Sequence, residues 1–227
     1  MPDPKIITDR RLGRSDIQAL LCDGAPVHLI DCDLEDADLS RLDLSSWTFE
    51  RCILRRTDLT GARLENSVWK SCRASFIRMA GARLTDTAFT SIDFSNGVFR
   101  GANLSGVSFV HSKLTGADLS EVRAIDLHFD ETLLVGAQLS ALSFRKQTLT
   151  RLDFAQADLR RCDFRDVVFE ESSLQGALVD EARFEGADLR GADLGGFRLV
   201  DARVLRGAII SRAQAAKLVS ELGLQVR

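Results

Sequence analysis

The stretch Ala187–Leu194, ADLRGADL, contains one short pattern twice, with a small residue, an Asp and a Leu that recur after five positions. Stepping by five from Leu189 in both directions meets 37 positions between Leu29 and Ile209, and every one of them is apolar. Nineteen are Leu and eleven are Phe. We call these the central positions. The residue two places earlier is Ala, Cys, Ser, Thr, Val or Gly in 28 of the 37 repeats, so each repeat offers one large and one small residue to a core.

A period of five matches neither the 3.6-residue period of a helix nor the two-residue period of a strand. A chain that turns a corner every five residues fits it. Gly stands two residues after the central position ten times, where it allows a positive φ, and Asp or Asn precedes the central position twelve times, where it can bond its own backbone. This pattern predicts a solenoid, in which each repeat buries its apolar face against its neighbours.

The segments Ala37–Ser40, Ala117–Ser120 and Ala187–Leu194 resemble the A(D/N)LxG motif of pentapeptide repeat proteins, and the repeat covers about 185 of the 227 residues. The resemblance implies an all-β solenoid of the kind this family forms, a right-handed quadrilateral β-helix. Four pentapeptides would make one coil, so that residues 20 apart in the sequence would stack on one another. About nine such coils would follow.

The two ends of the chain differ from the repeat, which suggests three parts: a cap at 1–26, the β-helix at 27–211, and a helix with a tail at 212–227. Residues 15–22 read as a short helix with Ser15 as its N-cap and Gly24 beyond its end. Residues 211–222 read as an amphipathic helix that ends at Gly223. Open strand edges invite aggregation, and both helices would cover one.

The gyrase-interacting Qnr and MfpA members of the family resemble this chain at the C-terminal end, with a Gln-Ala opening here at Gln214–Ala215 and a Gly-Leu pair here at Gly223–Leu224. In those relatives the segment joins two rods. The resemblance therefore implies a homodimer formed through the helix residues Ala215, Leu218, Val219 and Leu222. The alternative is that the helix only caps its own coil.

No residue set indicates catalysis or cofactor binding. Cys32, Cys52 and Cys72 would form one column, but stacked coils hold their Cβ atoms about 4.8 Å apart, which is too far for a relaxed disulfide, and no fourth metal ligand lies beside them. The glycines follow the five-residue period rather than a phosphate-binding loop. We expect a protein that is not an enzyme, with reduced thiols, no metal and no cofactor.

Composition argues against nucleic-acid-binding, membrane-spanning and secreted proteins. The chain has 30 Lys and Arg against 33 Asp and Glu, a net charge of −3, and this balance argues against direct binding of nucleic acid. No run of 18 apolar residues predicts a membrane span, and the N-terminal residues lack the apolar core of a secretory signal. We therefore expect a cytoplasmic protein.

The resemblance also implies a function, because the best-known members mimic DNA, bind DNA gyrase or topoisomerase IV, and protect the enzyme from quinolones or gyrase-directed toxins. The candidate carboxylates for such a partner are Asp130, Glu131, Glu170 and Glu171, with Asp33, Glu35 and Asp36 near the N-terminal end. One column alternates acidic with basic or imidazole groups at 20-residue steps, as in Asp31 and Arg51, His111 and Glu131, and Arg151 and Glu171, which predicts a solvated ladder of cross-coil ion pairs. The weak net charge leaves a second interpretation open, a structural scaffold with a different protein partner.

Overall fold

The computed structural model describes residues 4–22, 24–196 and 203–220. The chain divides into two compact units at Thr132 and Leu133, and each is a β-solenoid of 20-residue coils, about nine coils in all. None of the described helices has the length and the apolar surface that crossing a bilayer requires.

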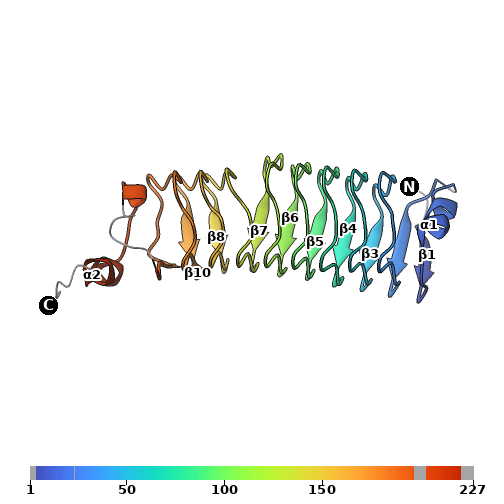
Figure 1. The fold of residues 1–227 in the computed structure, drawn as a ribbon, viewed down its shortest axis with the longest axis horizontal. Helices are drawn as coiled ribbons and strands as arrows, with labels where there is room; N and C mark the ends of the chain where they lie inside the picture. The colour runs from blue at the N-terminus through green and yellow to red at the C-terminus, as the bar shows by residue number, and fades with distance from the viewer. Residues whose placement is uncertain (1–3, 23, 197–202, 221–227) are drawn as a thin grey trace. The chain divides into compact units, whose positions relative to one another are not determined.

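The first unit contains a seven-stranded parallel sheet and one helix (Figure 1). Its elements are β1 (Lys5–Thr8), α1 (Arg14–Leu21), β2 (Val27–Ile30), β3 (Thr48–Glu50), β4 (Val68–Lys70), β5 (Ala88–Thr90), β6 (Ser108–Val110) and β7 (His128–Asp130). The second unit holds two short parallel pairs and a helix. These elements are β8 (Thr148–Thr150), β9 (Val168–Glu170), β10 (Ser172–Ser173), β11 (Ala192–Asp193) and α2 (Arg212–Ser220).

The coil has four sides, as the resemblance implied. From β2 to β7, neighbouring strands pair in parallel with an offset of 20 residues, for example Phe49 with Trp69. On each of the other three sides, successive coils are joined by isolated parallel β-bridges, for example those of Asp33 with Ile53, Asp38 with Asp58 and Asp43 with Arg63. Four sides of five residues therefore close one coil, and the predicted stacking of residues 20 apart is confirmed.

The corners use the backbone conformation that the Gly pattern predicted. Gly81 has φ 64°, and non-glycine residues at the same position of the repeat, such as Asp36 and Arg41, have φ 61° and 59°. The predicted Asp turns also form, since the Asp38 carboxylate accepts the backbone N–H of Ser40 at 2.9 Å. These bonds fix the corner by local geometry, which frees the coil-to-coil ladder to repeat without long loops.

The core lies inside the coils and consists of the central positions. From Leu29 to Leu194 these side chains are buried, with the single exception of the half-buried Ala124. Aromatic rings of successive coils stack, as in Phe49 on Trp69, whose ring centroids lie 4.2 Å apart. Burial of such side chains contributes about 1.5–3 kcal/mol each, which explains why one register of the repeat is apolar throughout.

The parallel ladder starts earlier than the repeat does. β1 pairs in parallel with β2, with Lys5 opposite Val27, although the sequence before Val27 shows no five-residue period. The short helix that follows is α1, which buries Ile17. Ser15 is not its N-cap: the N-cap is Gly13, whose N–H donates to the Asp16 carboxylate at 2.8 Å. The predicted stop is confirmed, because Gly24 has φ 65° and bonds back to the Leu21 carbonyl.

The repeat changes phase before its predicted end. Ile209 was expected at a central position, but it pairs with Asp188, which precedes the central Leu189, and its side chain is 49% exposed. Leu205, in a short 3₁₀ turn at 203–205, is buried in place of Val204. The offset between paired residues is 21 here rather than 20, so one residue more than the regular coil requires has been accommodated.

Candidate protein-binding surface

The acidic residues near the N-terminal end do not form a free anionic patch. Arg56 of the next coil donates to both carboxylate oxygens of Asp36, at 2.7 and 2.8 Å, and to Glu35 at 3.0 Å. Asp33 accepts the backbone N–H of Glu35, and the Arg11 guanidinium lies 3.8 Å from its second oxygen. All three predicted carboxylates are thus held by neighbours of the same unit, which leaves them less able to bind a basic partner.

Of the predicted cross-coil pairs, Asp31 with Arg51 and His111 with Glu131 are confirmed, whereas no Arg151–Glu171 pair is seen among the described residues. Arg51 contacts both carboxylate oxygens of Asp31, at 2.9 and 2.7 Å. The hydrogen bond from Arg51 lowers the pKa of Asp31, and that from Arg56 lowers the pKa of Asp36 in the same way. Because these groups are solvent-exposed, each pair contributes little to stability. Their consequence is local: they cancel much of the surface charge.

The second predicted pair, Asp130 and Glu131, lies at the end of β7. His111 of the preceding coil approaches it, with 3.4 Å between its Nε2 atom and the Glu131 carboxylate. The backbone N–H of His111 donates to the Asp130 carbonyl at 3.0 Å. The structure therefore places the His111 imidazole beside the Glu131 carboxylate, as the 20-residue spacing predicted, and joins His111 to Asp130 through the backbone.

The third pair, Glu170 and Glu171, stands at the end of β9 in the second unit, and both side chains are exposed. The Thr150 hydroxyl donates to Glu170 at 3.3 Å. Within the described residues no Lys or Arg nitrogen lies within 4 Å of either carboxylate. Both side chains are exposed and have no described cationic neighbour, so of the predicted acidic residues they are the best placed to contact a basic partner.

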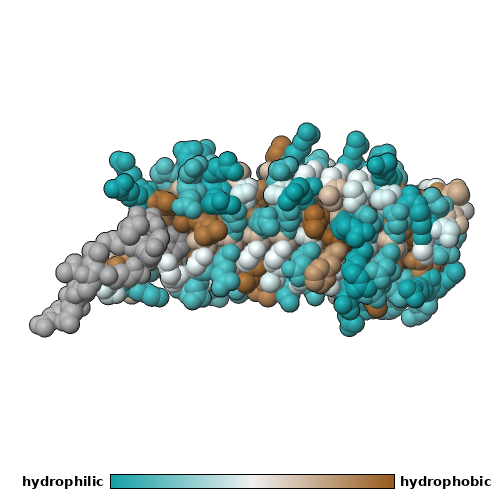
Figure 2. All heavy atoms as spheres, in the orientation of Figure 1, coloured by the Kyte–Doolittle hydropathy of each residue, from teal (hydrophilic) through white to brown (hydrophobic). Residues whose placement is uncertain are grey.

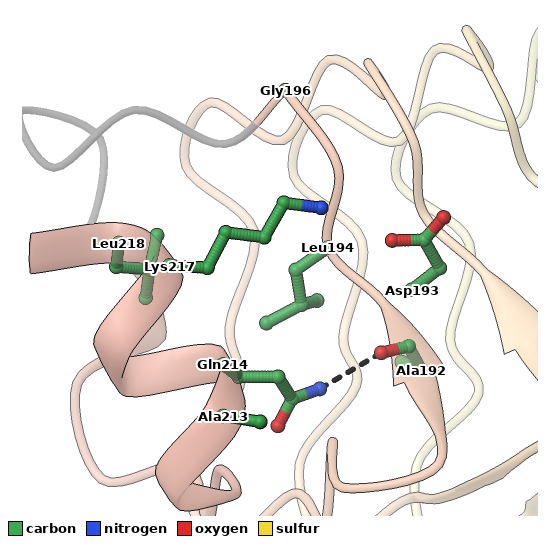
Figure 3. A pocket seen from close by; sticks show the side chains of 8 residues that line it. All are labelled: Ala192, Asp193, Leu194, Gly196, Ala213, Gln214, Lys217 and Leu218. Carbon is green, nitrogen blue, oxygen red and sulfur yellow. Dashed lines mark hydrogen bonds between the residues drawn. The ribbon is translucent and has the colours of Figure 1, made fainter. Parts of the chain in front are cut away.

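Gln214 fastens the C-terminal helix to the last coils, a role that the Gln-Ala pattern in the sequence did not predict. The Gln214 side chain donates to the carbonyl of Leu189 at 2.7 Å and to that of Ala192 at 2.8 Å, and Figure 3 shows the second of these bonds. Gln214 also accepts the N–H of Ser211, and the Ser211 hydroxyl accepts the N–H of Gln214, which makes a capping box. α2 therefore begins at Arg212, within one residue of the predicted start at Ser211, and packs as a cap on its own unit.

A cavity of about 200 Å³ remains between this helix and the coil below it (Figure 3). Leu194 and Leu218 line it together with the polar side chains of Asp193 and Lys217. Of the predicted dimer residues, Leu218 is buried in its own chain, and Ala215 and Val219 are half-buried. Leu222 and the pair Gly223–Leu224 lie outside the described residues.

The cysteines behave as small core residues. Cys32, Cys52 and Cys72 are free and buried, and each thiol contacts a backbone carbonyl, as at 3.4 Å between Cys52 and Leu29. Burial raises the pKa of the Cys162 thiol to about 12, so that it remains protonated at neutral pH. These four buried cysteines are free thiols, without a disulfide among them.

The remaining surface is mixed. Figure 2 shows hydrophilic residues over most of the visible face, with small hydrophobic patches between them. The larger apolar side chains that are exposed include Phe76 at 52% and Ile125 at 70%. Scattered single residues of this kind are ordinary on a soluble protein.

Comparison with known proteins agrees with the coil geometry. The profile of the family Pentapeptide repeats matches in eight copies, over residues 32–68, 82–121, 128–166, 168–204 and 180–215. The chain belongs to the pentapeptide repeat family. A sequence search of characterised proteins finds no match to it.

Solved structures add a likeness of fold. The chain is similar to full-length QnrB1, described as a plasmid-mediated fluoroquinolone resistance protein, with 19% identity, a TM-score of 0.65, and coverage of 97% of this chain and 98% of QnrB1. A trypsin-treated QnrB1 variant matches with 19% identity, a TM-score of 0.54, and coverage of 99% and 98%. At this identity the likeness establishes the fold alone.

Proposed function

We propose that this protein is a non-enzymatic, DNA-mimicking inhibitor or protector that binds DNA gyrase or a related type II topoisomerase and shields it from quinolones or a gyrase-directed toxin. The observation that carries the proposal is the extent of the match to QnrB1, which spans 97% of this chain and 98% of that one. A protein that shares only the repeat would match over the coils and diverge at the ends. The proposal places the chain in the cytoplasm, where the enzyme acts.

Contact with the partner is proposed through carboxylates that the protein has not already neutralised. Glu170 and Glu171 meet this condition, since both are exposed at the end of β9 and Glu170 accepts a hydrogen bond from the uncharged Thr150 hydroxyl. Asp130 and Glu131 are a second candidate contact of a different kind, because Glu131 already has a partner in His111. The cluster of Asp33, Glu35 and Asp36 is not part of this surface, because arginines of its own unit hold it.

The dimer belongs to the same proposal. In it α2 of two copies would meet through Ala215, Val219 and Leu222, with Leu218 supporting the helix from beneath. Leu218 is 8% exposed within one chain, so it is already used by the cap, whereas Ala215 and Val219 retain surface for a second copy. Capping and dimerisation are therefore compatible uses of two sides of one helix.

The test is a gyrase supercoiling assay with and without ciprofloxacin. We expect the protein at micromolar concentration to inhibit supercoiling or to restore it in the presence of the drug. The variant Glu170→Lys/Glu171→Lys should lose most of this effect. The matched control is Asp180→Lys/Glu181→Lys, which makes the same charge change on exposed residues at the opposite corner of a coil and should retain the effect. If the unmodified protein gives neither inhibition of supercoiling nor rescue from the drug, the proposal is refuted.

A second candidate function is an interaction scaffold with another protein partner. The charge distribution favours it, because Arg51, Arg56 and Arg78 each neutralise an Asp one coil earlier and the net charge is only −3. B-DNA carries one negative charge for about every 1.7 Å of its axis, which this surface does not approach. Equal gyrase activity with and without the protein, together with stable capture of a different partner, would select this candidate.

A further inference from the structure

The side chains of His111, Asp130 and Glu131 bring together three ligand atoms that all lie within 4.8 Å of one another. They come from two adjacent coils: His111 follows β6, and the two acids are the last residue of β7 and the corner after it. The ladder sets this arrangement, because Val110 pairs with Asp130 and the His111 N–H bonds to the Asp130 carbonyl at 3.0 Å. The backbone that carries the three groups is thus fixed by the fold.

The spacing suits a metal ion. Zinc binds His nitrogen and carboxylate oxygen at about 2.0–2.2 Å with tetrahedral angles, which places two ligand atoms about 3.3 Å apart. The His111 Nε2 atom and the Glu131 carboxylate oxygen are already 3.4 Å apart. A carboxylate oxygen of Asp130 lies within 4.8 Å of both other ligand atoms and supplies the third ligand of the set.

The chemistry of the ligands selects the class of ion. One neutral imidazole and two carboxylates place two negative charges around the ion, and a mixed nitrogen and oxygen set suits zinc or a similar first-row dication rather than magnesium or calcium. His111 is exposed and the two acids are half-buried, so that solvent can reach the ion and water can fill its fourth position. We propose that His111, Asp130 and Glu131 form a surface binding site for Zn²⁺ or a related divalent transition-metal ion. This revises the expectation from the sequence that the chain has no metal ligands.

The first unit contains a natural control. His28 and Glu50 form a similar pair across two coils, with 3.1 Å between Nε2 and the carboxylate. In the described part of the chain, no third ligand joins that pair to make a cluster. His28 can therefore report on an ordinary His–Glu contact that lacks the third ligand.

The experiment uses the full chain without an affinity tag, stripped with a chelator, in a Cys22→Ser background that removes the exposed thiol. Isothermal titration with ZnCl₂ and visible absorption on CoCl₂ addition should both show one saturable ion per chain. His111→Ala and Asp130→Asn should each weaken binding at least about tenfold, and His28→Ala should leave it within about twofold. These side chains lie at the surface, and equal thermal melting of all the variants confirms that the fold is intact.

Two outcomes would overturn the site. One is the absence of saturable binding to the parent protein up to millimolar Zn²⁺, which would make the cluster a plain His–carboxylate contact. The other is binding that His111→Ala leaves unchanged, which would place the ion elsewhere. Because neither result depends on gyrase, the site can fail without affecting the proposed function.

Discussion

Truncation of Phe109 to Ala should strongly destabilise the first unit. The Phe109 side chain is fully buried, and its ring stacks on Phe89 and Phe129 with centroids at 4.9 and 5.3 Å. It also makes edge contacts with Phe94 and Phe99, both at 6.1 Å. A buried Phe→Ala change costs about 3–5 kcal/mol, and stacked pairs add about 0.5–1.5 kcal/mol each, so we expect a loss near the upper end of the first range.

The assay is urea unfolding followed by circular dichroism, with amide hydrogen exchange to locate the loss in the coils around Phe109. The matched control is Phe76→Ala, because Phe76 is 52% exposed at a corner. Removal of that side chain should change the free energy of unfolding by less than about 0.5 kcal/mol. A loss below about 1 kcal/mol for Phe109→Ala, or equal losses for the two variants, would show that the central positions do not form the core.

Three further predictions concern the ends and the surface. Gln214→Leu removes both bonds that fasten α2 to the coil, so α2 should exchange its amides faster and be cleaved sooner by protease, while exchange in the coils stays unchanged; an unaltered α2 would contradict this role. Ion pairing with Arg56 lowers the pKa of Asp36 in the folded state, so the pair stabilises the fold above the usual Asp pKa and stops doing so as the pH falls through the pKa of Asp36 in the folded protein. Arg56→Gln should therefore lower the urea midpoint of unfolding more at pH 7 than at pH 2. An equal drop at both pH values would argue against the pair. Val219→Glu should halve the mass seen by light scattering with little loss of stability, whereas a change at the buried Leu218 should also loosen the cap; a dimer mass retained by the Val219 variant would exclude this interface.

The interior of the protein could be predicted from the sequence because a single register carries it. Each central residue has to be apolar in a coil that packs only on its neighbours, so the period of five identifies the core from Leu29 to Leu194 without further information. The ion pair of Asp31 with Arg51 could also be predicted from the sequence, because the two residues stand 20 positions, or one coil, apart. Regular stacking turns a spacing of 20 residues into a contact.

The departures from the repeat could not be predicted in this way. β1 pairs with β2 at an offset of 22 residues, because α1 intervenes, and an isolated strand without a repeated pattern gives no periodic signal. Near the other end one additional residue moves Ile209 out of the core and brings Leu205 in. The acceptors of Gln214 are backbone carbonyls, which exist in every residue and so leave no trace in the sequence.

Sequence patterns also could not separate free from neutralised carboxylates in every case. Asp36 and Glu171 occupy equivalent corners of the repeat, but a bidentate arginine holds the first and the second stands exposed. The spacing does not separate the two, because Arg56 stands 20 residues after Asp36 and Arg151 stands 20 residues before Glu171. The geometry of the guanidinium, with contacts to both Asp36 and Glu35, becomes visible only in the folded chain.

The proposed function requires this protein to occupy the DNA-binding surface of a type II topoisomerase. Its most direct test is biolayer interferometry of the full chain on immobilised gyrase holoenzyme, with and without an excess of linear duplex DNA. We expect saturable binding of the protein to gyrase, which excess duplex DNA abolishes and which the variant Glu170→Lys/Glu171→Lys weakens. Binding that is indifferent to the DNA, or no binding at about 10 μM protein, where a micromolar complex would be well populated, would contradict it.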